Sequence, residues 1–163
     1  MKKLLTLTLI FASAVIGLMA QVQISKVEAA NPSDEVFMDM AVTVAQTASA
    51  QGHAPQGAVV VLNGAWRASG MAVGGSTAEE DALARTRRTT IPTASVYTVN
   101  QPTDRALDAM AEAKISKVFY VNPMEDVIKA GLASAADYIR VSEQRPGLQV
   151  IRIDYAPAAR LIK

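Results

Sequence analysis

The chain has 163 residues, of which 50% are hydrophobic and 19% are charged, and its formal net charge is +1. This length and apolar content suit one globular domain and exclude an intrinsically disordered chain. There is no cysteine and only one histidine, His53. Disulfides and thiolate metal sites are therefore excluded, and a zinc site built from imidazoles is nearly excluded.

The first 29 residues have the pattern of a secretory signal, in which positive charges precede an apolar run. Lys2 and Lys3 provide the positive start, and residues 4–20 form an apolar run. We expect cleavage after Ala29, which leaves a single domain over residues 30–163, exported to the periplasm or the exterior without stable membrane insertion. An uncleaved anchor is the alternative, although the run is shorter than the roughly 20 residues that a spanning helix needs.

The charge balance argues against a nucleic-acid partner. The predicted signal contains three lysines and one glutamate, so its removal takes the 16 basic and 15 acidic side chains to 13 and 14. A nearly neutral domain has no electrostatic footprint for nucleic acid. The three arginines in residues 85–88 are explained by a solvated helix face.

Residues 31–52 are predicted to form a packing helix. Asn31-Pro32-Ser33 followed by Asp34-Glu35 places a capping residue and two acids at its start, where the helix dipole favours negative charge. One predicted apolar face has helical spacing; its members are Val36, Phe37, Met40, Ala41, Val44, Ala45 and Ala48.

Residues 57–72 are predicted to form an antiparallel hairpin. The nearly continuous apolar run over residues 57–62 suits a strand that is buried on both faces. Asn63-Gly64 is a strong hairpin signal, and residues 65–72 form the returning strand. Trp66, the only tryptophan, is expected to be a core residue rather than a binding platform.

The second half of the sequence alternates helices and strands. A helix is predicted from Ser76 to about residue 88, with Ser76 as its cap and Glu79 as the capping-box partner three residues later. The next expected elements are a strand over 94–99, a helix over 101–114, a strand over 117–121, a broken helix after Pro123 that Gly131 interrupts, and a strand over 149–153. Residues 155–163 have no clear assignment.

This order of elements predicts the architecture. Alternating strands and helices favour a parallel sheet covered on both faces, with the antiparallel hairpin at one edge. We therefore expect an α/β fold, a three-layer α/β/α sandwich around a five-stranded mixed sheet.

Several segments resemble the cytidine and adenosine deaminase superfamily. Pro55-Gln56-Gly57-Ala58-Val59 resembles its Pro-Val-Gly-Ala-Val strand, and Thr77-Ala78-Glu79 resembles its His-Ala-Glu helix start. Residues 97–106 resemble its Thr-x-Glu-Pro-Cys-x-x-Cys segment, and residues 115–120 its Ile-x-x-Val-Tyr-Tyr strand. The order and spacing of these segments, between residues 36 and 153, imply a cytidine-deaminase-like fold.

The resemblance also implies where the active site would lie. In the family, one His and two Cys hold zinc, which makes hydroxide from water, and a Glu that is not a ligand moves protons. Here Thr77 takes the His position, Thr103 and Ala106 take the Cys positions, and Glu79 takes the position of the proton-transferring Glu. Gln101 stands where the family often has Glu. Threonine hydroxyls are weak neutral ligands and alanine has none, so we expect no metal and no cofactor.

Two further questions concern this degenerate site. Glu79 is a candidate for proton transfer, but it is also the expected capping partner of Ser76. The helices near Ser76 and Pro102 are expected to point their N-termini at one spot, which suits ordered water between Thr77, Thr103 and Glu79, or a small anion.

Three functions are compatible with the sequence. The first is an exported, non-catalytic deaminase-like domain that binds a small ligand or a protein partner. The second is a metal-free enzyme that uses Glu79 on a nucleobase-like or amine substrate. The third is an extracytoplasmic structural or assembly subunit, for which a homo-oligomer is one form.

Overall fold

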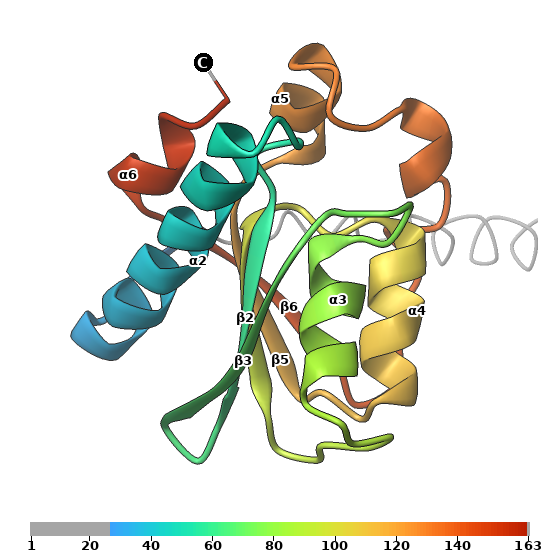
Figure 1. Ribbon diagram of the computed structural model, residues 1–163. Helices are drawn as coiled ribbons and strands as arrows, with labels where there is room; N and C mark the ends of the chain where they lie inside the picture. The colour runs from blue at the N-terminus through green and yellow to red at the C-terminus, as the bar shows by residue number, and fades with distance from the viewer. Residues whose placement is uncertain (1–26, 163) are drawn as a thin grey trace, which may run out of the picture.

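A six-stranded mixed sheet lies between two layers of helices (Figure 1). The structure is a computed structural model that describes residues 27–162. The strands are β1 (Glu28–Ala29), β2 (Gly57–Leu62), β3 (Ala65–Met71), β4 (Ser95–Asn100), β5 (Lys117–Asn122) and β6 (Gln149–Asp154), in the sheet order β1-β6-β5-β4-β2-β3. The predicted α/β class is confirmed, and the sixth strand is the short β1, which pairs with β6.

Helices cover both faces of the sheet. Figure 1 shows α2 (Pro32–Ala50) and α6 (Ala156–Ala159) on one face and α3 (Ala78–Arg85) and α4 (Asp104–Glu112) on the other. A separate core of buried side chains fills the space on each face. The broken helix after Pro123 consists of α5 (Met124–Lys129) and the 3-10 helix η2 (Ala135–Tyr138). No helix in the described part of the chain is long and apolar enough to cross a membrane.

Helix α2 begins as predicted but buries a different face. The Asn31 side chain accepts hydrogen bonds from the backbone N–H groups of Ser33 and Asp34. The buried apolar residues are Met38, Ala41, Val42, Ala45 and Ala48. Val36, which was expected to face the core, is 57% exposed.

Glycine in β2 explains which face α2 buries. A Cβ atom at Gly57 would lie 2.3 Å from the carbonyl oxygen of Ala41 and 2.6 Å from the backbone N of Ala45. The helix therefore approaches the sheet through its small residues. The residues from Val36 to Val44 are so apolar that the sequence pattern alone does not fix the rotation of the helix.

The hairpin is confirmed, but the prediction for Trp66 is wrong. Asn63 and Gly64 have φ values of 54° and 71°, as a two-residue turn with positive φ at both positions requires. Trp66 is 52% exposed, because it lies near the tip of the hairpin, which projects beyond the helices in Figure 1. A register shift between Val60 and Val61 interrupts the ladder at this point.

The parallel strands place several loops at one end of the sheet. Strands β4, β5 and β6 are mutually parallel, and β2 runs antiparallel to β4. The carboxyl ends of β4 and β5 therefore lie beside the start of β2. In open α/β sheets this end is where ligands usually bind.

The position of α3 depends on a glycine in β3. A Cβ atom at Gly70 would lie 2.2 Å from the backbone N of Ala82 and 2.4 Å from the carbonyl oxygen of Ala78. We expect Gly70→Ala to lower the free energy of unfolding by about 1–3 kcal/mol, because α3 must move away from the sheet. Chemical denaturation measures this change.

The matched control is Ser69→Ala. Successive side chains of a strand point to opposite faces, so this substitution does not face α3. An equal loss of stability in the two variants would contradict the close packing of α3 on β3.

Candidate functional site

Helix α3 begins with a capping box that is one residue later than predicted. Thr77 is the N-cap: its Oγ1 accepts a hydrogen bond from the Glu80 N–H at 3.2 Å, and the Glu80 carboxylate accepts one from the Thr77 N–H at 2.8 Å. The predicted pairing of Ser76 with Glu79 is therefore wrong. The sequence contains the box pattern twice, and the choice is favoured by Arg105, which pairs with Glu80 at 2.6 Å.

Glu79 is therefore not a member of the capping box. It is the second residue of α3, is only 6% exposed, and accepts a hydrogen bond from Thr98 Oγ1 at 2.6 Å. Burial raises the pKa of Glu79, and the hydrogen bond from Thr98 opposes the rise only in part. The protonated carboxyl is therefore favoured more than it is in an exposed glutamate.

Helix α4 begins in the same way, with a threonine as its cap. Thr103 Oγ1 accepts a hydrogen bond from the Ala106 N–H at 3.3 Å. Ala106 is fully buried in the core beneath α3 and α4. Thr77 and Thr103 stand at the metal-ligand positions of the family that the sequence resembles. Each hydroxyl accepts a hydrogen bond from a backbone N–H in the first turn of its helix.

A small cavity lies where the two helix starts meet. Its volume is about 20 Å³, and it is lined by Gln56, Thr77, Glu79, Thr98, Asn100, Gln101, Pro102, Thr103, Val127 and Tyr138. This is enough space for one water molecule and far too little for a heterocyclic ring. The structure brings Thr77, Glu79, Gln101 and Thr103 together around this cavity, whereas Ala106 does not line it.

The buried amide of Asn100 on β4 belongs to the wall of the cavity and is bonded to a second buried amide on β5. Asn122 Nδ2 donates to Asn100 Oδ1 at 3.0 Å and to the Ala158 carbonyl at 3.2 Å. Asn100 Nδ2 is buried without a hydrogen-bond partner among the described residues. A water molecule in the cavity would have a donor in Asn100 and an acceptor in Glu79, as a buried water requires.

Tyr138 covers the cavity from η2. It is 6% exposed, and its hydroxyl donates to the Gln101 carbonyl at 3.0 Å. Burial, together with the negative charge of Glu79, raises the pKa of Tyr138. The sequence analysis missed Thr98, Asn100 and Tyr138, although polar residues near the end of a buried strand, such as Thr98 and Asn100, are a usable signal.

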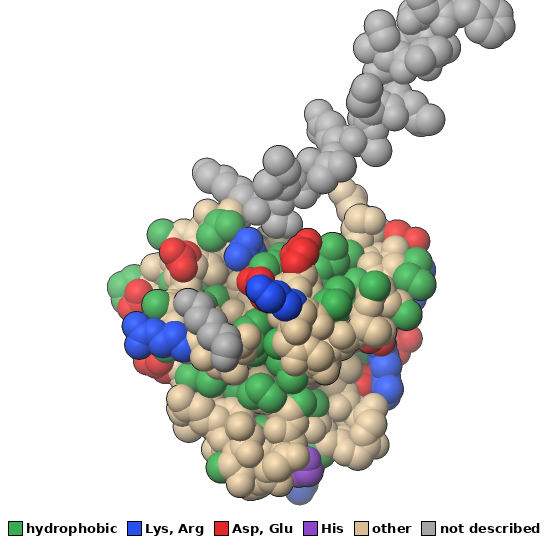
Figure 2. All heavy atoms as spheres, turned by 90° about the horizontal axis from the view of Figure 1, so that it is seen from above, with side chains coloured by type: hydrophobic (Ala, Val, Ile, Leu, Met, Phe, Trp, Pro, Cys, Tyr) green, Lys and Arg blue, Asp and Glu red, His purple; other side chains and the backbone are tan. Residues whose placement is uncertain are grey.

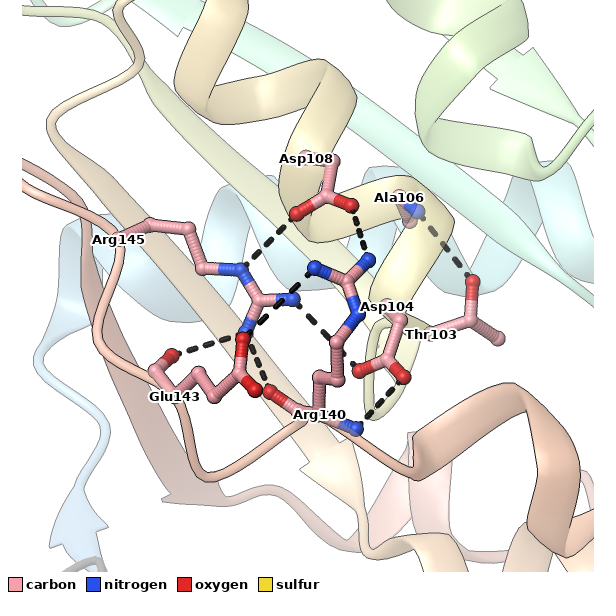
Figure 3. A network of polar contacts seen from close by, with 7 residues as sticks. All are labelled: Thr103, Asp104, Ala106, Asp108, Arg140, Glu143 and Arg145. Atoms are coloured by element: carbon pink, nitrogen blue, oxygen red, sulfur yellow. Dashed lines mark hydrogen bonds and ion pairs between the residues drawn. The ribbon is translucent and has the colours of Figure 1, made fainter.

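The segment that carries Tyr138 is fixed to α4 by ion pairs. We call residues 133–148 the strap. The Arg140 N–H donates to Asp104 Oδ2 at 2.8 Å, and Asp108 pairs with Arg140 at 2.6 Å and with Arg145 at 3.1 Å (Figure 3). The hydrogen bond from Arg140, followed by that from Arg145, holds the pKa of Asp108 below its ordinary value.

Arg145 is the most buried charge of this network. Its side chain is only 8% exposed and lies 3.6 Å from Asp104, beyond hydrogen-bond distance. Its Nη1 donates to the backbone carbonyls of Arg140 and Glu143, so it also fixes the path of the strap itself. The strap therefore keeps Tyr138 over the cavity.

Comparisons with known proteins agree with this architecture. A guanine deaminase from Nitrosomonas europaea has a TM-score of 0.63 and 21% identity, over 83% of this chain and 85% of that chain. A guanine deaminase from Bacillus subtilis has a TM-score of 0.58 and 27% identity, over 65% of this chain and 73% of that chain. The fold is cytidine-deaminase-like.

A third solved structure also resembles this chain. A structure of a tRNA:A34 deaminase has a TM-score of 0.57 and 22% identity, over 72% of this chain and 96% of that chain. No family model and no curated protein sequence matches the chain. The cytidine-deaminase-like fold is therefore established through structure.

The residues present in this cytidine-deaminase-like fold do not fit a zinc ion. Thr77 and Thr103 provide neutral hydroxyls that cap helices, and Ala106 has no ligand atom. His53 is exposed in the loop after α2. Within residues 27–162, no group of three His, Cys, Asp or Glu side chains could hold a metal ion.

We expect Glu79→Gln to stabilise the protein in a pH-dependent way. Because the native pKa of Glu79 is raised, its contribution to stability is full below the ordinary value of 4.5 and is lost as the pH rises through the native pKa. The variant should therefore gain stability over the unmodified chain as the pH rises above 4.5. Denaturation at pH 4 to 8 measures the difference.

The matched control for this experiment is Glu80→Gln. Glu80 is part of the capping box and pairs with the exposed side chain of Arg105, so its substitution should give no stabilisation. A Glu79→Gln variant that is uniformly less stable over the whole pH range would contradict the inference that burial raises the pKa of Glu79.

Thr103→Val should lower the free energy of unfolding by about 1–2 kcal/mol, because it removes the cap of α4 while nearly preserving the side-chain volume. Thr103→Ser retains the hydroxyl and should recover most of this loss. If Thr103→Val and Thr103→Ser have the stability of the unmodified chain, the hydroxyl of Thr103 does not stabilise α4.

Proposed function

We propose that the chain is an exported, non-catalytic domain with a deaminase-like fold that acts by binding, and that its ligand is a protein partner. The observation that carries this proposal is the cavity of about 20 Å³ at the position of the deaminase active site. To enter this cavity, a small ligand would have to displace Tyr138 and the strap, which ion pairs hold on α4. A protein partner needs no such opening.

The chemistry of the two helix starts supports the same proposal. Thr77 and Thr103 stand where the deaminases that the sequence resembles have metal ligands. In this chain, each hydroxyl accepts a hydrogen bond from a backbone N–H of its own helix. These contacts stabilise the two N-termini without a metal. Thr77, Gln101, Thr103 and Ala106 are on this view a vestigial pocket that preserves the fold.

Metal-free catalysis is the second candidate, and one observation favours it. Glu79 is buried with a raised pKa, which is a property of many catalytic acids and bases. On this alternative, opening of the strap would admit a nucleobase-like or amine substrate, and Glu79 would transfer a proton. A third candidate is an extracytoplasmic assembly subunit, whose oligomeric state light scattering would reveal.

Export remains a proposal that rests on the signal pattern of residues 1–29. Residues 1–26 lie outside the part of the chain that the structure describes. Residues Glu28–Ala29 form β1, so cleavage after Ala29 would remove the strand that pairs with the end of β6.

The proposal predicts that zinc neither co-purifies with the protein nor raises its melting temperature. A ligand of the folded state at a hundred times its dissociation constant would add about 2.7 kcal/mol, which a melting curve easily detects. Incubation with nucleosides, free bases and pterin-like amines should release no ammonia. Stoichiometric zinc that survives a chelator would contradict the proposal, and ammonia release that Glu79→Gln abolishes would establish the metal-free enzyme instead.

A further inference from the structure

Within residues 27–162, the outer edge of β6, the side away from β5, has few strand partners. Gln149 to Arg152 pair with β5 on the inner side, and β1 pairs only with Ile153 and Asp154 on the outer side. No other strand among residues 27–162 lies beside this edge. Val150 is 36% exposed, so the helix layer on its face of the sheet does not cover it, whereas Ile151 on the opposite face packs against the core.

The first three residues of this edge lack the features that usually protect edge strands, whereas Arg152 and Asp154 in its second half are charged. Charged residues, proline and bulges prevent unwanted strand pairing. At the opposite edge, β3 has Arg67 and the register shift opposite Val60 and Val61. In β6, Gln149, Val150 and Ile151 are uncharged and their pairing with β5 is regular.

The structure already contains an example of a strand on this edge. In β1, Glu28 lies opposite Ile153 and Ala29 lies opposite Asp154, in parallel orientation. This pair is only two residues long, so few hydrogen bonds oppose its opening. The outer edge of β6 can therefore exchange one extended segment for another.

We propose that the outer edge of β6 is a strand-acceptor site for an extended segment of a partner polypeptide, which binds parallel to β6 and takes the place of β1. This inference rests on the proposed binding function. In a chain that begins at Ala30, the outer edge of β6 is open over the whole length of Gln149–Asp154, and alternate residues direct their backbone groups to it.

A groove beside the edge indicates which side chains the partner presents. Its volume is about 890 Å³, and Val27, Arg152, Ile153 and Asp154 contribute to its lining together with residues of β5, α5 and the C-terminal segment. Figure 2 shows the end of the molecule where α5 lies, with apolar side chains among charges of both signs. The lining combines apolar residues with the charged side chains of Asp126, Lys129, Arg152 and Asp154. The partner therefore presents both apolar and polar side chains to the groove, while main-chain hydrogen bonds provide the affinity.

The test uses the full chain and a disulfide that locks β1 in place. Because the chain has no cysteine, Ala29→Cys with Asp154→Cys creates one cross-strand pair. The probe is the fluorescent peptide Thr-Val-Thr-Val-Glu-Ala-Ala, whose last four residues copy residues 27–30. We expect the reduced variant to bind it at least ten-fold more tightly than the oxidised variant. Equal binding would overturn the proposal.

Two controls separate strand addition from unspecific adsorption. A peptide with N-methylated backbone amides cannot form the ladder and should not bind; if it binds like the parent peptide, the proposal is wrong. In the unmodified chain, the parent peptide should shift the amide resonances of Gln149–Asp154 and not those of Ala65–Met71. Shifts in the second range alone would also overturn it, whether or not the disulfide variant folds.

The same protein preparations distinguish this inference from the proposed function. Zinc content and ammonia release are measured beside peptide binding. Absence of peptide binding, without zinc or deamination, rejects the acceptor edge and leaves the non-catalytic function intact. Zinc-dependent deamination rejects the proposed function whatever the peptide does.

Discussion

Two helix N-termini that converge on one small space are the constraint on which the rest of the structure depends. The first backbone N–H groups of a helix have no partners within it and carry partial positive charge. In α3 and α4 these groups are capped by the side chains of Thr77 and Thr103. Because the caps are neutral, the space between the helices can close around Glu79, Asn100 and a single water-sized cavity.

The closure then determines what surrounds the cavity. Tyr138 covers it through a hydrogen bond to the Gln101 carbonyl, and the ion pairs of the strap with Asp104 and Asp108 keep Tyr138 there. The Arg140–Asp108 pair lies between exposed side chains, so it contributes little to stability and mainly fixes the position of the strap. Arg145 differs, because its buried guanidinium requires the strap carbonyls and the α4 carboxylates as partners.

The parts of this fold that the sequence could predict are those that short sequence patterns specify. Asn31 before a helix, Asn63-Gly64 between strands and alternating apolar segments each specify a structure within a few residues. Besides the burial of Trp66, two predictions failed because two local choices were nearly equal: the capping box at Ser76 or Thr77, and the rotation of α2. Packing decided the second through the close approach of Gly57 to Ala41.

The candidate site was less predictable, because its parts meet only through tertiary contacts. The resemblance pointed to five residues. Thr77, Glu79, Gln101 and Thr103 line the cavity, and Ala106 does not. Tyr138 could not be predicted, since it reaches Gln101 from 37 positions away in the sequence. The buried position of Glu79 depends on the helix starting at Ala78, whereas the sequence predicted a cap at Ser76 with Glu79 as its partner.

The Asn100–Asn122 pair has a consequence for how β4 and β5 find their alignment. The two residues lie opposite each other in the parallel ladder and are almost fully buried. A shift of β5 by one residue would turn Asn122 to the other face of the sheet and separate the amides. Each would then be buried without its partner, at a cost of about 1–3 kcal/mol per group. Apolar strands of valine and phenylalanine tolerate such slippage, so this amide pair selects one alignment among otherwise similar ones.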